Sequence, residues 1–259
     1  MPPMPPMPPP TVDPSTPRQV IPRPAGSRAG RPARWAELDE TRRRSIGLER
    51  VRAAVAAGGG WVAGHPDRRR QTAAFEGKAT GPTAAVLVPL YEQADETRVI
   101  LTVRSSDLRS HRDEVAFPGG RLDAGEEVVA GALREAWEEV GLDPSAVSVV
   151  GTLDQLATSS SNTLVTPVVG TLEGRPSLAA NPGEVARIFD LALADLLVDG
   201  VFHEEWWSVP GAPQLDGRPD PEFPVWFFEA GGEIIWGATA RILVDLLSLA
   251  LGTGEPLGN

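Results

Sequence analysis

Apolar residues in the central part of the chain fall into short runs with the length and composition of β-strands. Residues 84–90 and 98–103 are two such runs, and the polar segment YEQADET between them predicts a β-hairpin. Similar runs at 147–154 and 163–172, and the aromatic segments WWSV and VWFFEA, predict further strands. We therefore expect the central part of the chain to be built on a β-sheet.

Other segments have the apolar spacing of α-helices. The clearest is 126–140, where Val129, Leu133, Ala136 and Val140 fall on one side of the helix. Helices are also predicted in three further segments, RWAELDETRRRSIGLERVRAAVAAG (34–58), FDLALADLL (189–197) and WGATARILVDLLSLALG (236–252). Strands and helices alternate without a strict βαβ repeat, so we expect an α/β fold with a mixed sheet and helices on both faces.

The start of the chain differs in composition from the rest. Residues 1–32 are rich in proline and arginine and contain no aromatic residue, which predicts a disordered tail or local polyproline II structure. The expected organisation has four parts: this tail, an N-terminal helix and linker at 33–80, the main domain at 81–252 and a C-terminal tail at 253–259.

Residue usage restricts the class of protein. The 259-residue chain is 41% hydrophobic and contains no cysteine, which excludes disulfides, thiolate metal sites and a cysteine nucleophile. No apolar run approaches the ~18 residues of a membrane span, and the N-terminus shows no apolar core of a signal peptide. We expect a soluble, cytoplasmic protein without a membrane partner. Its oligomeric state stays open, a homodimer included.

The formal net charge of −11 is unevenly distributed. Residues 1–70 carry 13 basic and 6 acidic side chains, whereas residues 71–259 carry 11 and 29. An acidic main domain argues against nucleic acid as a partner, because such binding depends on neutralising phosphates. The basic arm is either a solvated tail or a contact for anionic partners, and both interpretations stay open.

Three glutamates, Glu135, Glu138 and Glu139, share one face of the helix predicted at 126–140. At ~5.5 Å and an effective dielectric of about 20, two carboxylates repel by roughly 3 kcal/mol. One interpretation is an ordinary surface helix. The other is a site for Mg²⁺ or Mn²⁺, because the preceding segment FPGGRLDAGEE can bring backbone carbonyls close to these carboxylates.

The stretch GRLDAGEEVVAGALREAWEEVGL, from Gly120 to Leu142, resembles the complete signature box of the Nudix hydrolases. The resemblance implies an α/β/α sandwich, a requirement for Mg²⁺ or Mn²⁺, and hydrolysis of a diphosphate linked to another moiety. It implies that the three glutamates bind the metal together with the backbone carbonyl of Gly119. It also implies that Arg134 and Glu126 hold the loop and the helix together.

The segment ILTVRSSDLRSHRDEVAFPGG (100–120) is similar to the signature of the coenzyme A pyrophosphatase branch of this family. It matches at five places, namely Thr102, Arg104, Ser105, Arg109 and the closing FPGG. It departs at Ile100, where leucine is usual, and at Asp113, where the branch has glycine. A glycine there permits a backbone angle that aspartate tolerates less well. Segments 181–197 and 234–247 also look like this branch.

Arginines suit phosphate oxygens, so Arg104 and Arg109, with His111, are candidates for recognising the phosphates of coenzyme A. The alternative is an edge-strand salt bridge for Arg104 and a solvated loop for the other two. Glu184 in NPGEV is a candidate for the general base or an additional metal ligand; the alternative is a glutamate at a helix start that complements the helix dipole.

For coenzyme A the resemblance implies the products 3′,5′-ADP and 4′-phosphopantetheine, or its acylated form from an acyl-CoA. Two alternatives stay open. The substrate could be another nucleoside diphosphate derivative or a nucleoside triphosphate, for instance ADP-ribose, or the domain could bind a nucleotide without turnover.

Overall fold

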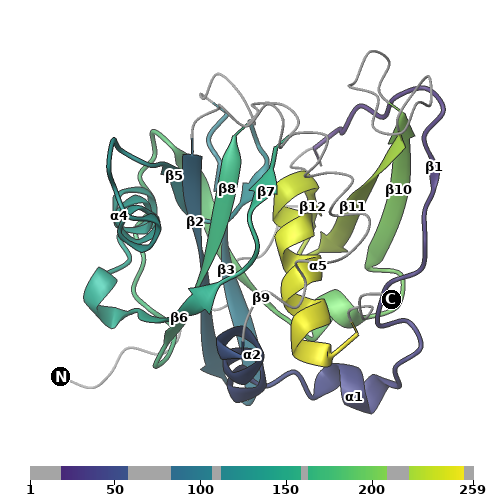
Figure 1. Cartoon of the computed structure of the whole chain (residues 1–259), viewed down its shortest axis with the longest axis horizontal. Helices are drawn as coiled ribbons and strands as arrows, with labels where there is room; N and C mark the ends of the chain where they lie inside the picture. The colour runs from purple at the N-terminus through teal and green to yellow at the C-terminus, as the bar shows by residue number, and fades with distance from the viewer. Residues whose placement is uncertain (1–18, 58–82, 107–111, 159–162, 209–221, 254–259) are drawn as a thin grey trace.

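The computed structural model describes residues 19–57, 83–106, 112–158, 163–208 and 222–253 (Figure 1). Its described part is centred on a mixed sheet of eight strands. Strand β2 (Thr83–Gln93) pairs in parallel with β8 (Leu164–Leu172) and antiparallel with β3 (Glu96–Arg104). The other strands of this sheet are β4 (Val115–Ala116), β5 (Gly119–Arg121), β6 (Ser148–Thr152), β7 (Leu156–Ala157) and β9 (Val185–Ala192).

A second, antiparallel sheet has the strand order β1-β10-β11-β12. Its strands are β1 (Arg28–Ala29), β10 (Phe202–Ser208), β11 (Glu222–Ala230) and β12 (Glu233–Trp236). The long C-terminal helix α5 (Gly237–Leu251) follows β12 directly and packs against β11, β12 and α2 (Leu48–Ala56). The other helices are α1 (Glu40–Arg44), α4 (Val128–Val140) and two short 3₁₀ helices at Pro144–Ala146 and Asp195–Leu197.

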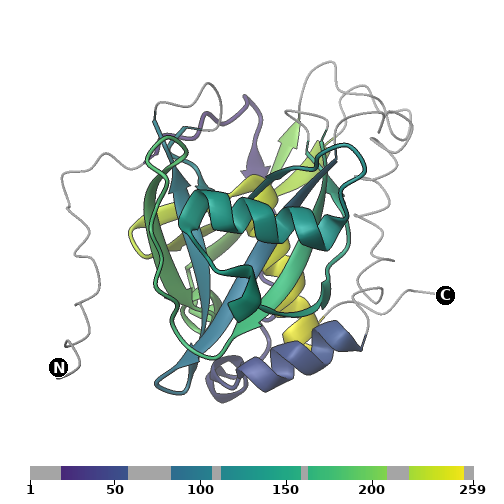
Figure 2. The same ribbon diagram turned by 90° about the vertical axis from the view of Figure 1, so that its left-hand side faces the viewer.

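Side chains that alternate along β2 build a core on each face of the main sheet. Leu87 and Tyr91 pack beneath α4, whereas Val88 and Leu90 point to the opposite face, which α2 and α5 cover. Figure 2 shows α4 lying across its face of the sheet. The predicted mixed sheet with helices on both faces is therefore confirmed.

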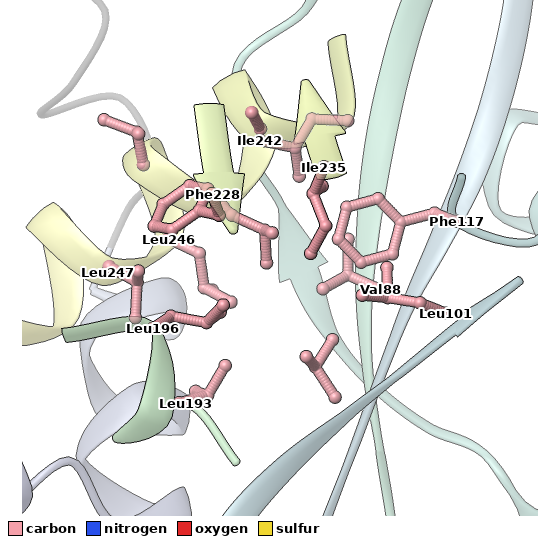
Figure 3. Close-up of a cluster of buried hydrophobic side chains, with 14 of the residues drawn as sticks. Val88, Leu101, Phe117, Leu193, Leu196, Phe228, Ile235, Ile242, Leu246 and Leu247 are labelled. Atoms are coloured by element: carbon pink, nitrogen blue, oxygen red, sulfur yellow. The ribbon is translucent and has the colours of Figure 1, made fainter. Parts of the chain in front are cut away.

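The larger core joins the two sheets. In Figure 3, Val88, Leu101 and Phe117 of the main sheet and its adjoining loop face Phe228 and Ile235 of the second sheet, and leucines of α5 close the cluster. Strand β12 and helix α5 are thus packed against the main sheet.

Several predicted elements are confirmed. The hairpin comprises β2 and β3, and its turn residues Ala94 and Asp95 have φ angles of 53° and 63°, as expected for a tight turn between twisted strands. The strand expected at 163–172 is β8, and the helix expected at 236–252 is α5.

The helix predicted at 189–197 is wrong. Its first four residues, 189–192, belong to β9, which pairs antiparallel with β3 from Arg98↔Ala192 onward, and only Asp195–Leu197 forms a 3₁₀ turn. A short apolar run does not distinguish a buried strand from a helix, and here pairing with β3 decides for the strand.

The single helix predicted at 34–58 is also wrong, because the segment forms two helices. Helix α1 is capped by the side chain of Asp39 and ends at Ser45, and Gly47 is the N-cap of α2. Trp35 precedes both helices and is buried against Phe202 and Phe228.

The first part of the predicted tail, residues 1–18, lies outside the described residues. Residues 19–32 contact the second sheet at a few points, although most of their side chains are exposed: β1 pairs with β10 at Arg28↔Trp206, and Ile21 is buried beside Phe227. The packed part of the protein therefore begins before residue 33.

We expect Phe228→Ala to destabilise the protein by about 3–5 kcal/mol, because the ring is fully buried between Trp35 and Phe202 and its removal leaves a cavity. Urea denaturation followed by tryptophan fluorescence measures this loss. Val198→Ala, at a side chain that is 51% exposed, is the control and should change stability little. Equal losses in the two variants would contradict this assignment of the core.

Candidate active site

A glycine segment passes between the central strand β2 and helix α4. Strand β5 pairs with β2 at Ala85↔Gly120 and Val86↔Gly119. A Cβ atom on Gly119 would lie 2.5 Å from Ala85 O, and one on Gly120 would lie 2.5 Å from the Glu135 carboxyl carbon. A side chain at Gly119 would therefore collide with the backbone of β2, whereas one at Gly120 would have to displace the Glu135 carboxylate.

The carboxylate of Glu139 is buried where the glycine segment meets α4. Its side chain is only 4% exposed. The backbone N–H of Gly119 donates to Glu139 Oε2 over 3.1 Å, and Arg104 Nη1 lies 3.7 Å from Glu139 Oε1. Burial raises the pKa of the Glu139 carboxyl to about 7, in opposition to the Gly119 hydrogen bond and the charge of Arg104.

Arg134 ties the loop to the helix. Its Nε and Nη2 donate to the two oxygens of Glu126 at 2.8 and 2.9 Å, and Nη2 also donates to Arg121 O. Hydrogen bonds from Arg134 lower the pKa of Glu126 to about 2. Nη1 of the same guanidinium donates to Glu135 and Glu138 at 2.9 and 3.1 Å. Arg134 thus neutralises part of the charge that the helix collects.

The glutamates remain an electrostatic cluster despite this arginine. Burial raises the pKa of Glu135, and the charges of Glu138 and Glu184 raise it further, against the influence of Arg134. The charges of Glu184 and Glu135 likewise raise the pKa of Glu139. Ionising all of these carboxylates together is therefore unfavourable unless additional positive charge is supplied.

The donor set fits a hard divalent cation. In the described ranges, no three histidine, aspartate or glutamate side chains already surround one point where a metal ion could sit. However, the carboxylate oxygens of Glu135 adjoin the position that a Cβ on Gly120 would fill, and Glu139 Oε2 accepts from the neighbouring Gly119 N–H. Oxygen donors with unrelieved negative charge are what Mg²⁺ and Mn²⁺ prefer.

Arg104 does not lie at a sheet edge, and it makes an ion pair with Glu139 of α4. Around Arg104, β3 pairs with β9 at Val185, and the Arg104 N–H donates to Glu114 O. Its guanidinium lies beside Glu139 instead, and its Nε is buried without a hydrogen-bond partner within the described residues. The structure therefore leaves a buried donor next to the carboxylates.

The remaining predicted residues fall into two groups. Glu184 lies in a turn before β9, and its carbonyl accepts from the Ser105 N–H. Because no helix starts at Glu184, its interpretation as a residue that complements a helix dipole is wrong. Asp113 has a φ of 57°, the left-handed angle that a glycine would favour. Arg109 and His111 lie outside the described residues.

Residues 81–211 match the family model of the NUDIX domain. The chain belongs to the Nudix family. It is 41% identical over 165 residues to an uncharacterized Nudix hydrolase, NudL, of Photorhabdus laumondii, a match that covers 63% of this chain and 82% of that protein. It is 38% identical over 164 residues to a NudL of Escherichia coli O7:K1, covering 63% and 80%.

Among solved structures, the chain resembles a Nudix hydrolase of M. smegmatis, RenU, with 21% sequence identity and a TM-score of 0.40, over 45% of this chain and 73% of that one. The predicted enzyme class is confirmed by the family: this protein is a Nudix hydrolase, acting on phosphoanhydride bonds. Nudix hydrolases bind small nucleotide derivatives and generally use divalent cations such as Mg²⁺ or Mn²⁺. None of the helices described is long and apolar enough to cross a lipid bilayer.

One feature of this Nudix site was missed in the sequence, and another was expected. The contact of Arg104 with Glu139 joins residues 35 positions apart, and no local pattern announces it. The approach of the glycine segment to the helix carboxylates was expected from FPGGRLDAGEE, and in the structure Gly120 adjoins Glu135.

We expect Gly120→Ala to lower kcat by about 100-fold, because the new methyl group displaces the Glu135 carboxylate from its place beside the loop. Steady-state hydrolysis of a nucleoside diphosphate substrate with Mn²⁺ measures the effect. Gly174→Ala is the matched control, since nothing lies within 4 Å of a Cβ at that position. An unchanged kcat in Gly120→Ala would show that the approach of loop and helix does not matter for turnover.

Proposed function

We propose that this Nudix hydrolase cleaves the diphosphate of coenzyme A or an acyl-CoA, releasing 3′,5′-ADP and 4′-phosphopantetheine or its acyl form. The observation that carries the proposal is the position of Arg104, which comes from the segment 100–120 that resembles the coenzyme A branch. Its guanidinium adjoins the box carboxylate Glu139, and its buried Nε has no hydrogen-bond partner in the described part of the chain. A substrate phosphate oxygen is a suitable acceptor for that donor.

The conformation of Asp113 supports the same substrate class. The coenzyme A branch has glycine at this position, and Asp113 adopts the left-handed backbone angle that such a glycine would serve. Aspartate is among the non-glycine residues that enter this region most readily. The departure from the signature therefore preserves the turn, although it adds a negative charge to the segment.

In this proposal Glu135, Glu138 and Glu139 would hold Mg²⁺ or Mn²⁺ together with the Gly119 carbonyl. The ion would neutralise charge on the leaving phosphate and lower the pKa of a bound water. Glu126 and Arg134 keep the loop against the helix. Glu184 is the candidate to accept the proton of the attacking water or to serve as a further ligand, supported by its electrostatic influence on Glu135 and Glu139.

The proposal extends to further phosphate-binding residues, to the cellular compartment and to the partner. Arg109 and His111 are proposed to bind the phosphates as well, by their places in the matching segment. We propose a cytoplasmic enzyme, in keeping with the absence of cysteine, whose partner is a small coenzyme A-like nucleotide rather than a membrane or a specific nucleic acid. Both a monomer and a homodimer are compatible with this function.

A substrate panel tests the proposal. Coenzyme A, acetyl-CoA, ADP-ribose and a nucleoside triphosphate are incubated separately with the protein and Mg²⁺ or Mn²⁺, and products are identified by mass spectrometry. We expect 3′,5′-ADP together with 4′-phosphopantetheine, and the highest kcat/KM for a coenzyme A substrate. A higher kcat/KM for ADP-ribose would overturn the assignment of substrate while leaving the enzyme class intact.

The glutamate assignment has its own test. We expect the double variant Glu138→Gln/Glu139→Gln to lose about 10³-fold or more in kcat, because both side chains would then lack the charge that binds the cation. Glu127→Gln is the control. Glu127 is exposed at the start of α4, several turns before Glu138, and its side chain makes no capping hydrogen bond. Thermal unfolding checks that both variants fold. Turnover that survives in the double variant would rule out these residues as the metal ligands.

A further inference from the structure

Two threonine hydroxyl groups hold successive carbonyls of the two-residue strand β4. Thr102 Oγ1, on β3, donates to Ala116 O over 3.1 Å, and Thr239 Oγ1, on α5, donates to Val115 O over 2.9 Å. The side chains belong to residues that are only 1% and 8% exposed. Each bond therefore satisfies a carbonyl in a region from which water is largely excluded.

Strand β4 leads directly into the active-site glycines. After Ala116, the ring of Phe117 is buried in the core beside Ile235 (Figure 3), and Pro118 O accepts from the Leu87 N–H at 2.8 Å. The next N–H, that of Gly119, is the one that donates to Glu139. Every residue from Val115 to Gly119 is thus anchored, and on β4 the two threonine hydroxyls add to the backbone pairing with β3 at Thr102↔Ala116 and Val103↔Val115.

Thr239 brings the far end of the chain into this arrangement. It lies in the first turn of α5, about a hundred residues beyond the box, in the segment WGATARIL that the enzyme chemistry described above does not use. Helix α5 is itself fixed by buried residues such as Leu243 and Leu246, which lie in the core between the sheets. One hydroxyl group therefore links α5 to β4, the strand that precedes the glycines.

We propose that Thr102 and Thr239 are positioning residues for the hydrolase reaction: by clamping the carbonyls of β4 from two sides, they place Gly119 and Gly120 against Glu139 and Glu135. Neither residue touches the reacting atoms. The proposal depends on Nudix turnover at this site but not on which phosphoanhydride is the substrate, so it is separable from the assignment to coenzyme A.

The test compares Thr102→Val and Thr239→Val with Thr171→Val. Valine keeps the shape and removes the hydroxyl. Thr171 is a matched control because it is also buried, at 3%, and its Oγ1 donates to a backbone carbonyl, Ser148 O, at 3.4 Å on the β6–β8 pair. Each variant is assayed with whichever substrate the wild-type protein turns over fastest, and thermal unfolding is recorded alongside.

We expect kcat to fall by about tenfold or more in Thr102→Val and Thr239→Val with KM changed less than about twofold, since a displaced loop weakens transition-state contacts rather than substrate binding. Thr171→Val should keep the wild-type kcat, even if its stability falls as much. Thr239→Ser, which restores the hydroxyl, should recover most of the activity.

Nuclear magnetic resonance supplies a readout that is independent of turnover. The amide resonance of Gly119 should shift and its hydrogen exchange should accelerate in Thr102→Val and Thr239→Val, but not in Thr171→Val. If Thr239→Val does not fold, Thr102→Val decides the question by the same criteria. The proposal is overturned if Thr102→Val and Thr239→Val fold but keep the wild-type kcat, or if their Gly119 amide is unperturbed. Absence of turnover by the wild-type protein on every substrate would instead contradict the proposed function.

Discussion

The hydrogen bond from the Gly119 backbone to the Glu139 carboxylate joins the two parts of this site. Glu139 is buried, so its charge needs a donor, and the backbone N–H of Gly119, a residue without a side chain, supplies one. The approach also brings Gly120 against Glu135. If this contact opened, the glycine segment would move away from the carboxylates of α4, which are the proposed ligands of the cation.

Central strand β2 explains why the contact forms. It pairs with β5 along the glycines, its Leu87 N–H binds Pro118 O, and its side chains support α4 from below. Loop and helix are therefore aligned on the same strand rather than on each other alone. The arginines then distribute charge around the glutamates: Arg134 spans Glu126, Glu135 and Glu138, and Arg104 approaches Glu139 from the end of β3.

The elements that were predicted correctly are those with a local cause. The hairpin of β2 and β3 has two apolar runs and a polar turn, and α5 has a continuous helical pattern ended by Gly252. The segment 189–197 was predicted wrongly because its apolar residues suit either structure, and only the partner strand β3 selects one. The break between α1 and α2 was missed because apolar residues continue across Gly47.

The sequence by itself determined that three carboxylates lie beside a glycine segment, because the helical period puts Glu135, Glu138 and Glu139 on one face and consecutive glycines allow a backbone to come close. Only the tertiary structure decided that Arg104 lies beside Glu139, that Glu184 acts on the same carboxylates from a turn before β9, and that Thr239 reaches the strand before the glycines. These contacts depend on strand register, including the irregularity between Val103 and Arg104, and on how α5 packs. Register and packing are set by the whole core, so no local stretch of sequence contains them.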